Sequence, residues 1–192
     1  MNFDKQYYKS RNYTNYLDRE DRYIKMSEEL ISFLEKHEYI NKTTKMLDYG
    51  CAVGFLINGI KKQNYDCYGY DISEWAQKES FRRFGIKFVE NVYNKFGLMF
   101  CLDVFEHMYD DQILNCLSTF DPDILVVRIP CADFNKNYYH LDISKNDPTH
   151  INCKDKNQWF DFFKKRGYKN FVRLDLLTIY DSTGVMSYII YK

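Results

Sequence analysis

The apolar positions of the chain divide it into alternating helix-like and strand-like segments. From Arg22 to His37 they recur three, four and seven residues apart, which predicts an amphipathic helix. Beyond this helix, short apolar runs alternate with segments of helical period. The runs predict seven strands, at 45–49, 65–70, 86–89, 98–102, 124–129, 171–180 and 185–191, and the periods predict helices at 53–62, 73–84, 111–117 and 155–166.

This order of elements predicts the fold class. Strands that alternate with short helices imply crossover connections, and therefore a mostly parallel sheet covered by helices on both faces. The last two strands are joined only by Asp181–Gly184, which indicates an antiparallel hairpin. We therefore expect an α/β fold, a three-layer α/β/α sandwich whose mostly parallel seven-stranded sheet ends in that hairpin. No linker or repeat divides residues 1–192, so a single domain is expected.

Composition and charge narrow the range of partners. The 192 residues carry 27 basic and 27 acidic side chains, so no net charge favours a long nucleic acid or an anionic membrane. No apolar run approaches the length of a membrane span, and the polar N-terminus is unlike a signal peptide. The six cysteines form no C-x-x-C pair, which favours reduced thiols in a cytoplasmic protein over disulfides or a zinc site. The oligomeric state stays open.

The most specific chemical signal is the turn that follows the first predicted strand, Asp48-Tyr49-Gly50-Cys51-Ala52-Val53-Gly54-Phe55. A strand that enters a helix through a glycine turn lets the backbone approach a ligand closely. Twenty-one positions after Gly50 the second strand ends at Asp71, where an acid can accept hydrogen bonds from ribose hydroxyls. These features predict a nucleoside-containing cofactor. A dinucleotide fingerprint would need glycine at Ala52 and Phe55, so nicotinamide-dependent oxidoreduction is disfavoured.

The turn Asp48-x-Gly50-x-Ala52-x-Gly54 resembles the D-x-G-x-G-x-G turn of class I S-adenosylmethionine-dependent methyltransferases, with alanine in place of the middle glycine. Three later segments are similar, in the same order, to one large branch of that family. They are the D-V-x-E-H-like segment 103–107, the fifth-strand segment 124–130 with its proline, and the D-x-x-H-like segment 147–152. Gly97 departs from the pattern, since an acid often begins the fourth strand. The resemblance covers residues 45–191.

The resemblance implies S-adenosyl-L-methionine as the cofactor and S-adenosyl-L-homocysteine as the product. It implies that Asp71 holds the ribose hydroxyls and that Leu102 and Asp103 lie beside the sulfonium. Implied cofactor contacts are Asp48, Gly50, Cys51, Ala52, Gly54, Phe55, Asp71, Ile72, Asn91, Val92, Leu102 and Asp103. The segment 1–22, with Tyr13, Tyr16 and Arg22, resembles a lid over the cofactor, and an exposed lead-in to the first helix is the alternative.

Transfer of a methyl group to a hydroxyl requires loss of the acceptor proton, so a positioned base is expected. His150 is the leading candidate, with Asp147 as its orienting partner and His107 also at the methyl end of the cofactor. The alternatives are that His107 braces its loop, that His150 is a structural loop histidine and that Asp147-Pro148 starts a turn. Carboxylates have no compact spacing that indicates a metal, and none is expected.

We therefore expect an enzyme that O-methylates a hydroxyl of a small molecule or a glycan. The preference for a glycan rests on the resemblance of the D-P-T-H-like segment alone. Tyr138 and Tyr139, in the loop 131–146, are expected to form a wall of the acceptor site. N- or carboxyl-methylation of a small metabolite, in which neither histidine acts as a base, is an alternative. A non-catalytic partner protein with the same fold is another.

Overall fold

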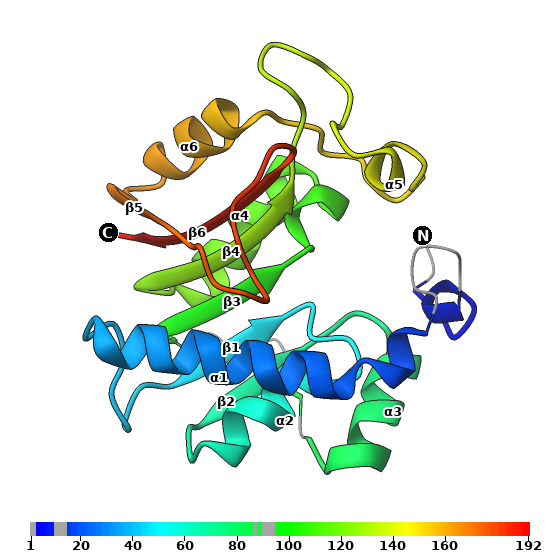
Figure 1. Ribbon diagram of the computed structural model, residues 1–192, viewed down its shortest axis with the longest axis vertical. Helices are drawn as coiled ribbons and strands as arrows, with labels where there is room; N and C mark the ends of the chain where they lie inside the picture. Colours follow the sequence, from blue (N-terminus) through cyan, green and yellow to red (C-terminus); the bar gives the residue numbers. More distant parts are fainter. Residues whose placement is uncertain (1–2, 10–14, 87, 90–94) are drawn as a thin grey trace.

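The computed structural model describes residues 3–9, 15–86, 88–89 and 95–192. A single six-stranded sheet forms its centre, in the order β2-β1-β3-β4-β6-β5 (Figure 1). Neighbouring strands among β1 to β4 pair in parallel, and β6 lies antiparallel between β4 and β5. The strands are β1 (Met46–Tyr49), β2 (Cys67–Tyr70), β3 (Leu98–Leu102), β4 (Ile124–Pro130), β5 (Asn170–Arg173) and β6 (Val185–Tyr191).

The α/β class, the parallel order and the terminal antiparallel hairpin are confirmed, but the sheet has six described strands where seven were predicted. Among its described residues, the predicted strand 86–89 makes an isolated parallel bridge between Gly69 and Phe88, with the Val89 N–H donating to the Gly69 carbonyl. Its four-residue run lies beside β2, which is equally short, so there is little length for a continuous ladder. The predicted strand 171–180 is regular only over β5, since the chain turns back on itself between Asp175 and Tyr180.

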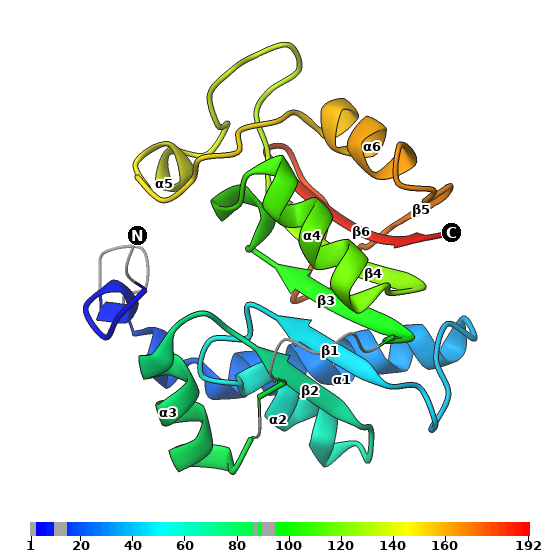
Figure 2. The same cartoon turned by 180° about the vertical axis from the view of Figure 1, so that it is seen from behind.

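Helices cover both faces of the sheet (Figures 1 and 2). On one face, α1 (Glu20–Lys36) and α2 (Phe55–Lys62) bury a core that includes Leu30, Leu34 and Ile57. On the other, α4 (Asp110–Phe120) and α6 (Lys156–Lys164) bury a second core that includes Phe120 and Trp159. This confirms the three-layer arrangement. In the part of the chain that the structure describes, no helix is both long and apolar enough to cross a membrane.

Two further helices complete the fold near the ends of the strands. In α3 (Glu74–Phe84), the predicted N-cap Ser73 accepts a hydrogen bond from the Ala76 N–H through its hydroxyl. The single-turn helix α5 (Asp142–Lys145) lies beyond the end of the sheet, on the same side as the N-terminal 3-10 turns (Figures 1 and 2). The helix α5 and the N-terminal turns therefore lie near the carboxyl ends of the parallel strands.

The strand order determines where a ligand can bind. Since β1 lies between β2 and β3, the chain leaves β1 toward one side of the sheet and later returns on its other side. Open α/β sheets bind ligands outside the carboxyl ends of their strands at such a switch point. The glycine turn after β1 is therefore flanked by Asp71 after β2 and by Asp103 after β3.

Candidate active site

A cavity of about 590 Å³ opens at this switch point, a size typical of small-molecule sites. Most of the predicted cofactor contacts line it: Tyr16, Asp48, Gly50, Cys51, Ala52, Phe55, Asp71, Ile72, Leu102 and Asp103. The candidate His107 also lines it, as do Phe3, Tyr7 and Tyr8 of the N-terminal segment. Tyr13, Asn91 and Val92 lie outside the described residues. Arg22 lines a second, adjoining cavity instead.

The turn after β1 has the backbone that its glycines predict. Gly50 and Gly54 have φ angles of +78° and +80°, in the left-handed region that favours glycine. A Cβ on Gly50 would lie 2.5 Å from Cγ2 of Val104, so only a hydrogen fits there. Gly54 does not line the cavity; a Cβ there would meet Ile86 and Ser80 beneath the turn. The turn is therefore packed closely from below and open toward the cavity.

Ala52, which replaces the middle glycine of the resembling pattern, also has a left-handed φ, of +48°. This conformation costs an L-residue about 1–2 kcal/mol. A short hydrogen bond holds it there, because the Ala52 N–H donates to Oδ2 of Asp71 at 2.7 Å. Alanine therefore leaves the turn intact, and the turn is tied directly to the end of β2.

Asp71 is fixed by backbone groups on two sides. Besides the bond from Ala52, its Oδ1 accepts a hydrogen bond from the Ser73 N–H at 2.7 Å. Burial raises the pKa of Asp71, and these two backbone N–H groups oppose that rise. The carboxyl group thus has a set direction at the cavity wall, while the neighbouring Ile72 side chain is 64% exposed and offers an apolar surface.

Asp48 is a buried acid at the bottom of the same cavity. Burial, and then the charge of Asp71, raise the pKa of Asp48 to about 8. Asp48 therefore carries a proton in most molecules at neutral pH. A cationic group bound beside it would favour the charged carboxylate again, so this end of the cavity suits a ligand that carries positive charge.

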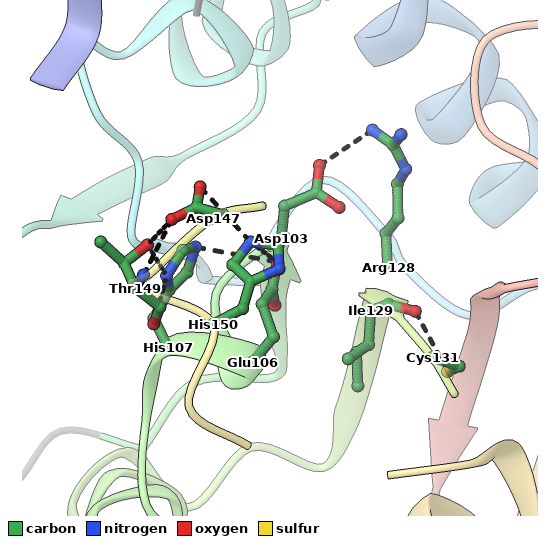
Figure 3. A network of polar contacts seen from close by, with 9 residues as sticks. All are labelled: Asp103, Glu106, His107, Arg128, Ile129, Cys131, Asp147, Thr149 and His150. Atoms are coloured by element: carbon green, nitrogen blue, oxygen red, sulfur yellow. Dashed lines mark hydrogen bonds and ion pairs between the residues drawn. The ribbon is translucent and has the colours of Figure 1, made fainter. Parts of the chain in front are cut away.

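The second cavity, of about 200 Å³, adjoins the first and shares Tyr16, Tyr23 and Asp103 with it. Asp103 stands at this boundary with a φ of +57°, and its side chain pairs with Arg128 at 2.9 Å (Figure 3). Other polar residues that line the second cavity are Arg19, Arg22, Glu106, Ser144, Asp147 and His150. The two cavities thus form neighbouring compartments that meet at the end of β3.

The expected acceptor wall differs in detail from the structure. The loop 131–146 lines the second cavity with Leu141, Ile143 and Ser144. Neither Tyr138 nor Tyr139 is among the lining residues. Tyr139 is buried, and its ring packs against that of His150 with centroids 5.1 Å apart. Tyr139 therefore packs against the His150 ring and does not line the cavity.

His107 and His150 come together from segments far apart in the sequence (Figure 3). His107 ends the 3-10 turn Phe105–His107 after β3, and His150 lies in the loop before α6. The Glu106 carbonyl accepts hydrogen bonds from the N–H groups of Ile151 and Asn152, which holds the two segments together. The two imidazole rings stand edge to face with centroids 4.7 Å apart.

Asp147 does not form the expected hydrogen bond with His150, since its Oδ2 lies 3.7 Å from Nε2 of that ring. Its Oδ1 accepts hydrogen bonds from the N–H and the hydroxyl of Thr149. The Thr149 hydroxyl and carbonyl lie 2.8 and 3.1 Å from Nδ1 of His107. Asp147 therefore orients His107 through Thr149, and its effect on His150 is electrostatic.

Glu106 is a site residue to which the sequence assigned no role. Its side chain is fully buried, and within the described part of the chain neither carboxylate oxygen has a hydrogen-bond partner. Nε2 of His107 and Nε2 of His150 lie 3.8 and 4.0 Å from its Oε1. Burial raises the pKa of Glu106 well above its usual value, whereas burial and then His107 lower the pKa of His150 to about 4. The available signal was its place inside the D-V-x-E-H-like segment.

Fold and site together define a class I, Rossmann-like S-adenosylmethionine-dependent methyltransferase. The chain belongs to the methyltransferase domain family, whose model matches residues 18–171. Its cofactor is S-adenosyl-L-methionine and its product S-adenosyl-L-homocysteine. The residues present fit this cofactor. The backbone at Gly50 has room only for a hydrogen in place of a side chain, and Asp71 is held at the cavity wall by backbone N–H groups. Asp48, whose pKa is raised, can ionise beside a cationic group.

Solved structures share the fold at low sequence identity. A methyltransferase from Archaeoglobus fulgidus is 15% identical, with a TM-score of 0.60 over 86% of this chain and 94% of that one. One from Clostridium acetobutylicum is 14% identical, with a TM-score of 0.63 over 88% and 91%. The magnesium protoporphyrin IX methyltransferase of Synechocystis, with bound cofactor, is 15% identical, with a TM-score of 0.57 over 89% and 80%. No curated protein matches the sequence.

Proposed function

We propose that this methyltransferase acts on a hydroxyl oxygen of a small-molecule or glycan acceptor bound in the second cavity. The observation that supports this most directly is the junction of the two cavities. His107 lines the larger cavity, His150 lines the smaller one, and the two rings are in contact. An acceptor in the smaller cavity would therefore meet an imidazole where the compartments adjoin.

The chain's part in cofactor binding follows from the larger cavity. S-adenosylmethionine, when bound, supplies a methyl group activated on a sulfonium. We propose that the turn after β1 and Asp48 hold its methionine part, Asp71 its ribose hydroxyls and Ile72 its adenine. The N-terminal segment would exclude water as a lid, because Tyr8 and Tyr16 are buried against the cavity and Phe3 is tied to Ser73 through its carbonyl. Exclusion of water strengthens the electrostatic contacts within such a site.

A hydroxyl acceptor must lose its proton as the new bond to carbon forms. Since burial lowers the pKa of His150 to about 4, its ring is neutral near pH 7 and has a lone pair free to accept a proton. Tyr139 packs on this ring and limits its rotation. We propose that His150 receives the acceptor proton, with Asp147, 3.7 Å from the ring, stabilising the cation that results.

One observation favours carboxyl-methylation as a second candidate. The small cavity is lined by Arg19, Arg22 and Arg128, and Arg22 is an exposed guanidinium at its margin. Guanidinium groups bind carboxylates with paired hydrogen bonds. A carboxylate acceptor is already ionised at neutral pH and would need no base, so the two reactions differ in their dependence on His150.

The test is turnover of His150→Ala at saturating labelled cofactor, assayed on pooled hydroxyl and carboxylate compounds. O-methylation predicts loss of about 10²–10⁴-fold in kcat, the usual contribution of a positioned base. His37→Ala is the matched control, since His37 is exposed at the end of α1, and it should leave turnover unchanged. Methylation of hydroxyl compounds that survives His150→Ala would refute the base, and methyl esters formed at the wild-type rate would support the second candidate.

A further inference from the structure

We propose that Glu106, His107 and His150 form a binding site for one divalent first-row transition-metal ion at the junction of the two cavities. The carboxylate oxygen and one nitrogen of each ring lie within 4.8 Å of one another. This constellation joins the turn after β3 to the loop before α6, and Figure 3 shows both rings beside the carboxylate.

The Glu106 carboxyl group is buried without hydrogen bonds among the described residues. A carboxylate buried without hydrogen bonds is strongly destabilised unless a positive charge or a proton accompanies it. Glu106 is fully buried, and among the described residues its oxygens have no hydrogen-bond donor. Its nearest polar neighbours are the two Nε2 atoms, at 3.8 and 4.0 Å from Oε1. These distances are too long for hydrogen bonds and leave space between the atoms.

The tautomer of His107 points to the same site. Nδ1 of His107 lies 2.8 Å from the Thr149 hydroxyl, whose hydrogen is donated to Asp147, and 3.1 Å from the Thr149 carbonyl oxygen, which has none. Both oxygens can then only accept, so Nδ1 carries the hydrogen. In the neutral ring Nε2 then has no hydrogen, and it lies 3.8 Å from Oε1 of Glu106. An ionised carboxylate beside this nitrogen makes a pair of acceptors, which a cation bound between them would bring together. A hydrogen bond from the other ring nitrogen to a carbonyl is also how metal-binding histidines are generally oriented.

The ligand set indicates the class of ion. Two imidazoles and one carboxylate suit Zn²⁺, Co²⁺, Mn²⁺ or Fe²⁺ rather than Ca²⁺, which prefers oxygen ligands throughout. With bonds of about 2.0–2.2 Å in a tetrahedral arrangement, ligand atoms lie about 3.3–3.6 Å apart. The atoms observed within 4.8 Å therefore need to approach one another by at most roughly 1.5 Å. Three protein ligands leave a position open for water or for an acceptor oxygen from the small cavity.

The ion would change how the acceptor proton is removed. A bound divalent cation lowers the pKa of a coordinated oxygen, so a hydroxyl in the open position would ionise near neutral pH and release its proton to solvent water. His150 would then serve as a ligand, and its loss would still abolish O-methylation. This consequence rests on the proposed function, whereas the binding site itself does not.

Metal binding can be measured without turnover. Chelator-treated protein is titrated with Co²⁺, followed by its visible absorption and by calorimetry, and Zn²⁺ is used to displace it. We expect one ion per chain, with affinity at least tenfold weaker in Glu106→Gln and in His107→Gln. Asp133→Asn is the control, because Asp133 pairs with His140 at 2.6 Å in a half-exposed acid–histidine pair that is not part of the cluster, and it should bind like the wild type. Thermal denaturation verifies that each variant is folded.

The outcomes separate the two proposals. Absence of a saturable Co²⁺ site in wild type, or equal affinity in folded Glu106→Gln, overturns the metal site. If the ion binds as expected but hydroxyl compounds are not methylated, the proposed function fails and the metal site stands. If hydroxyl compounds are methylated by metal-free protein at the full rate, the ion has no part in the reaction.

Discussion

Asp48→Asn should stabilise the free protein at neutral pH and weaken cofactor binding. The pKa of Asp48 is raised from 3.8 to about 8, mainly by burial. The folded state therefore binds one more proton than the unfolded state between these values, and its stability falls as the pH rises through this window. The contribution of the protonated carboxyl is complete below about pH 3.8 and is lost by about pH 8. Asparagine has a similar shape and no charge to bury.

The magnitude follows from the width of the window. Each pH unit between the two pKa values costs about 1.4 kcal/mol, so the roughly three units below pH 7 amount to about 4 kcal/mol. For a chain of this length, that corresponds to a rise in Tm of roughly 8–16 °C. At pH 4 the same substitution should change stability by less than about 1 kcal/mol.

The assay is denaturation of cofactor-free protein at pH 4 and pH 7, beside calorimetry with S-adenosylhomocysteine at pH 7. Asp175→Asn is the control, since Asp175 is exposed and its replacement should stay within about 0.5 kcal/mol at either pH. The reasoning is refuted if Asp48→Asn stabilises equally at both pH values, or if it destabilises the protein at pH 7. Unchanged cofactor affinity would refute the part of Asp48 in binding.

Three further substitutions test the larger cavity by calorimetry with S-adenosylhomocysteine. Gly50→Ala should reduce cofactor affinity more than tenfold, because a Cβ there meets Val104. Gly85→Ala is its control, since Gly85 has a φ of +61° and no atom lies within 4 Å of the added Cβ. This control should cost only about 1 kcal/mol of stability and leave cofactor binding intact. Asp71→Ala should weaken binding by about 2 kcal/mol or more, roughly 30-fold, since hydrogen bonds to a charged group are lost. Tyr16→Ala should raise the dissociation rate of the cofactor if the N-terminal segment acts as a lid, and an unchanged rate would refute that role.

Periodicity predicted the architecture because each face of the sheet is covered by a helix whose buried residues recur with the helical period. The glycine turn and Asp71 were predictable because their chemistry is local: a left-handed backbone and an acid at a strand end are both visible in sequence. The predicted strand 86–89 forms an isolated bridge among its described residues, since a run of four residues does not reveal how many ladder bonds it will make. Glu106 was not predicted as a site residue, because its role depends on His150, which lies more than forty residues later in the sequence and is brought beside it by the fold.

The hydrogen bonds from Ile151 and Asn152 to the Glu106 carbonyl have a consequence for how this enzyme can change its substrate. They attach the backbone beside His150 to the turn after β3, whereas Leu141, Ile143 and Ser144 reach the small cavity from the loop 131–146. Substitutions at 141–144 can therefore reshape that cavity while the histidines keep their positions, provided that Tyr139, which packs on His150, is retained. If the acceptor binds there as proposed, directed evolution toward a new acceptor should concentrate mutations at 141–144 and leave Tyr139, 103–107 and 147–152 untouched.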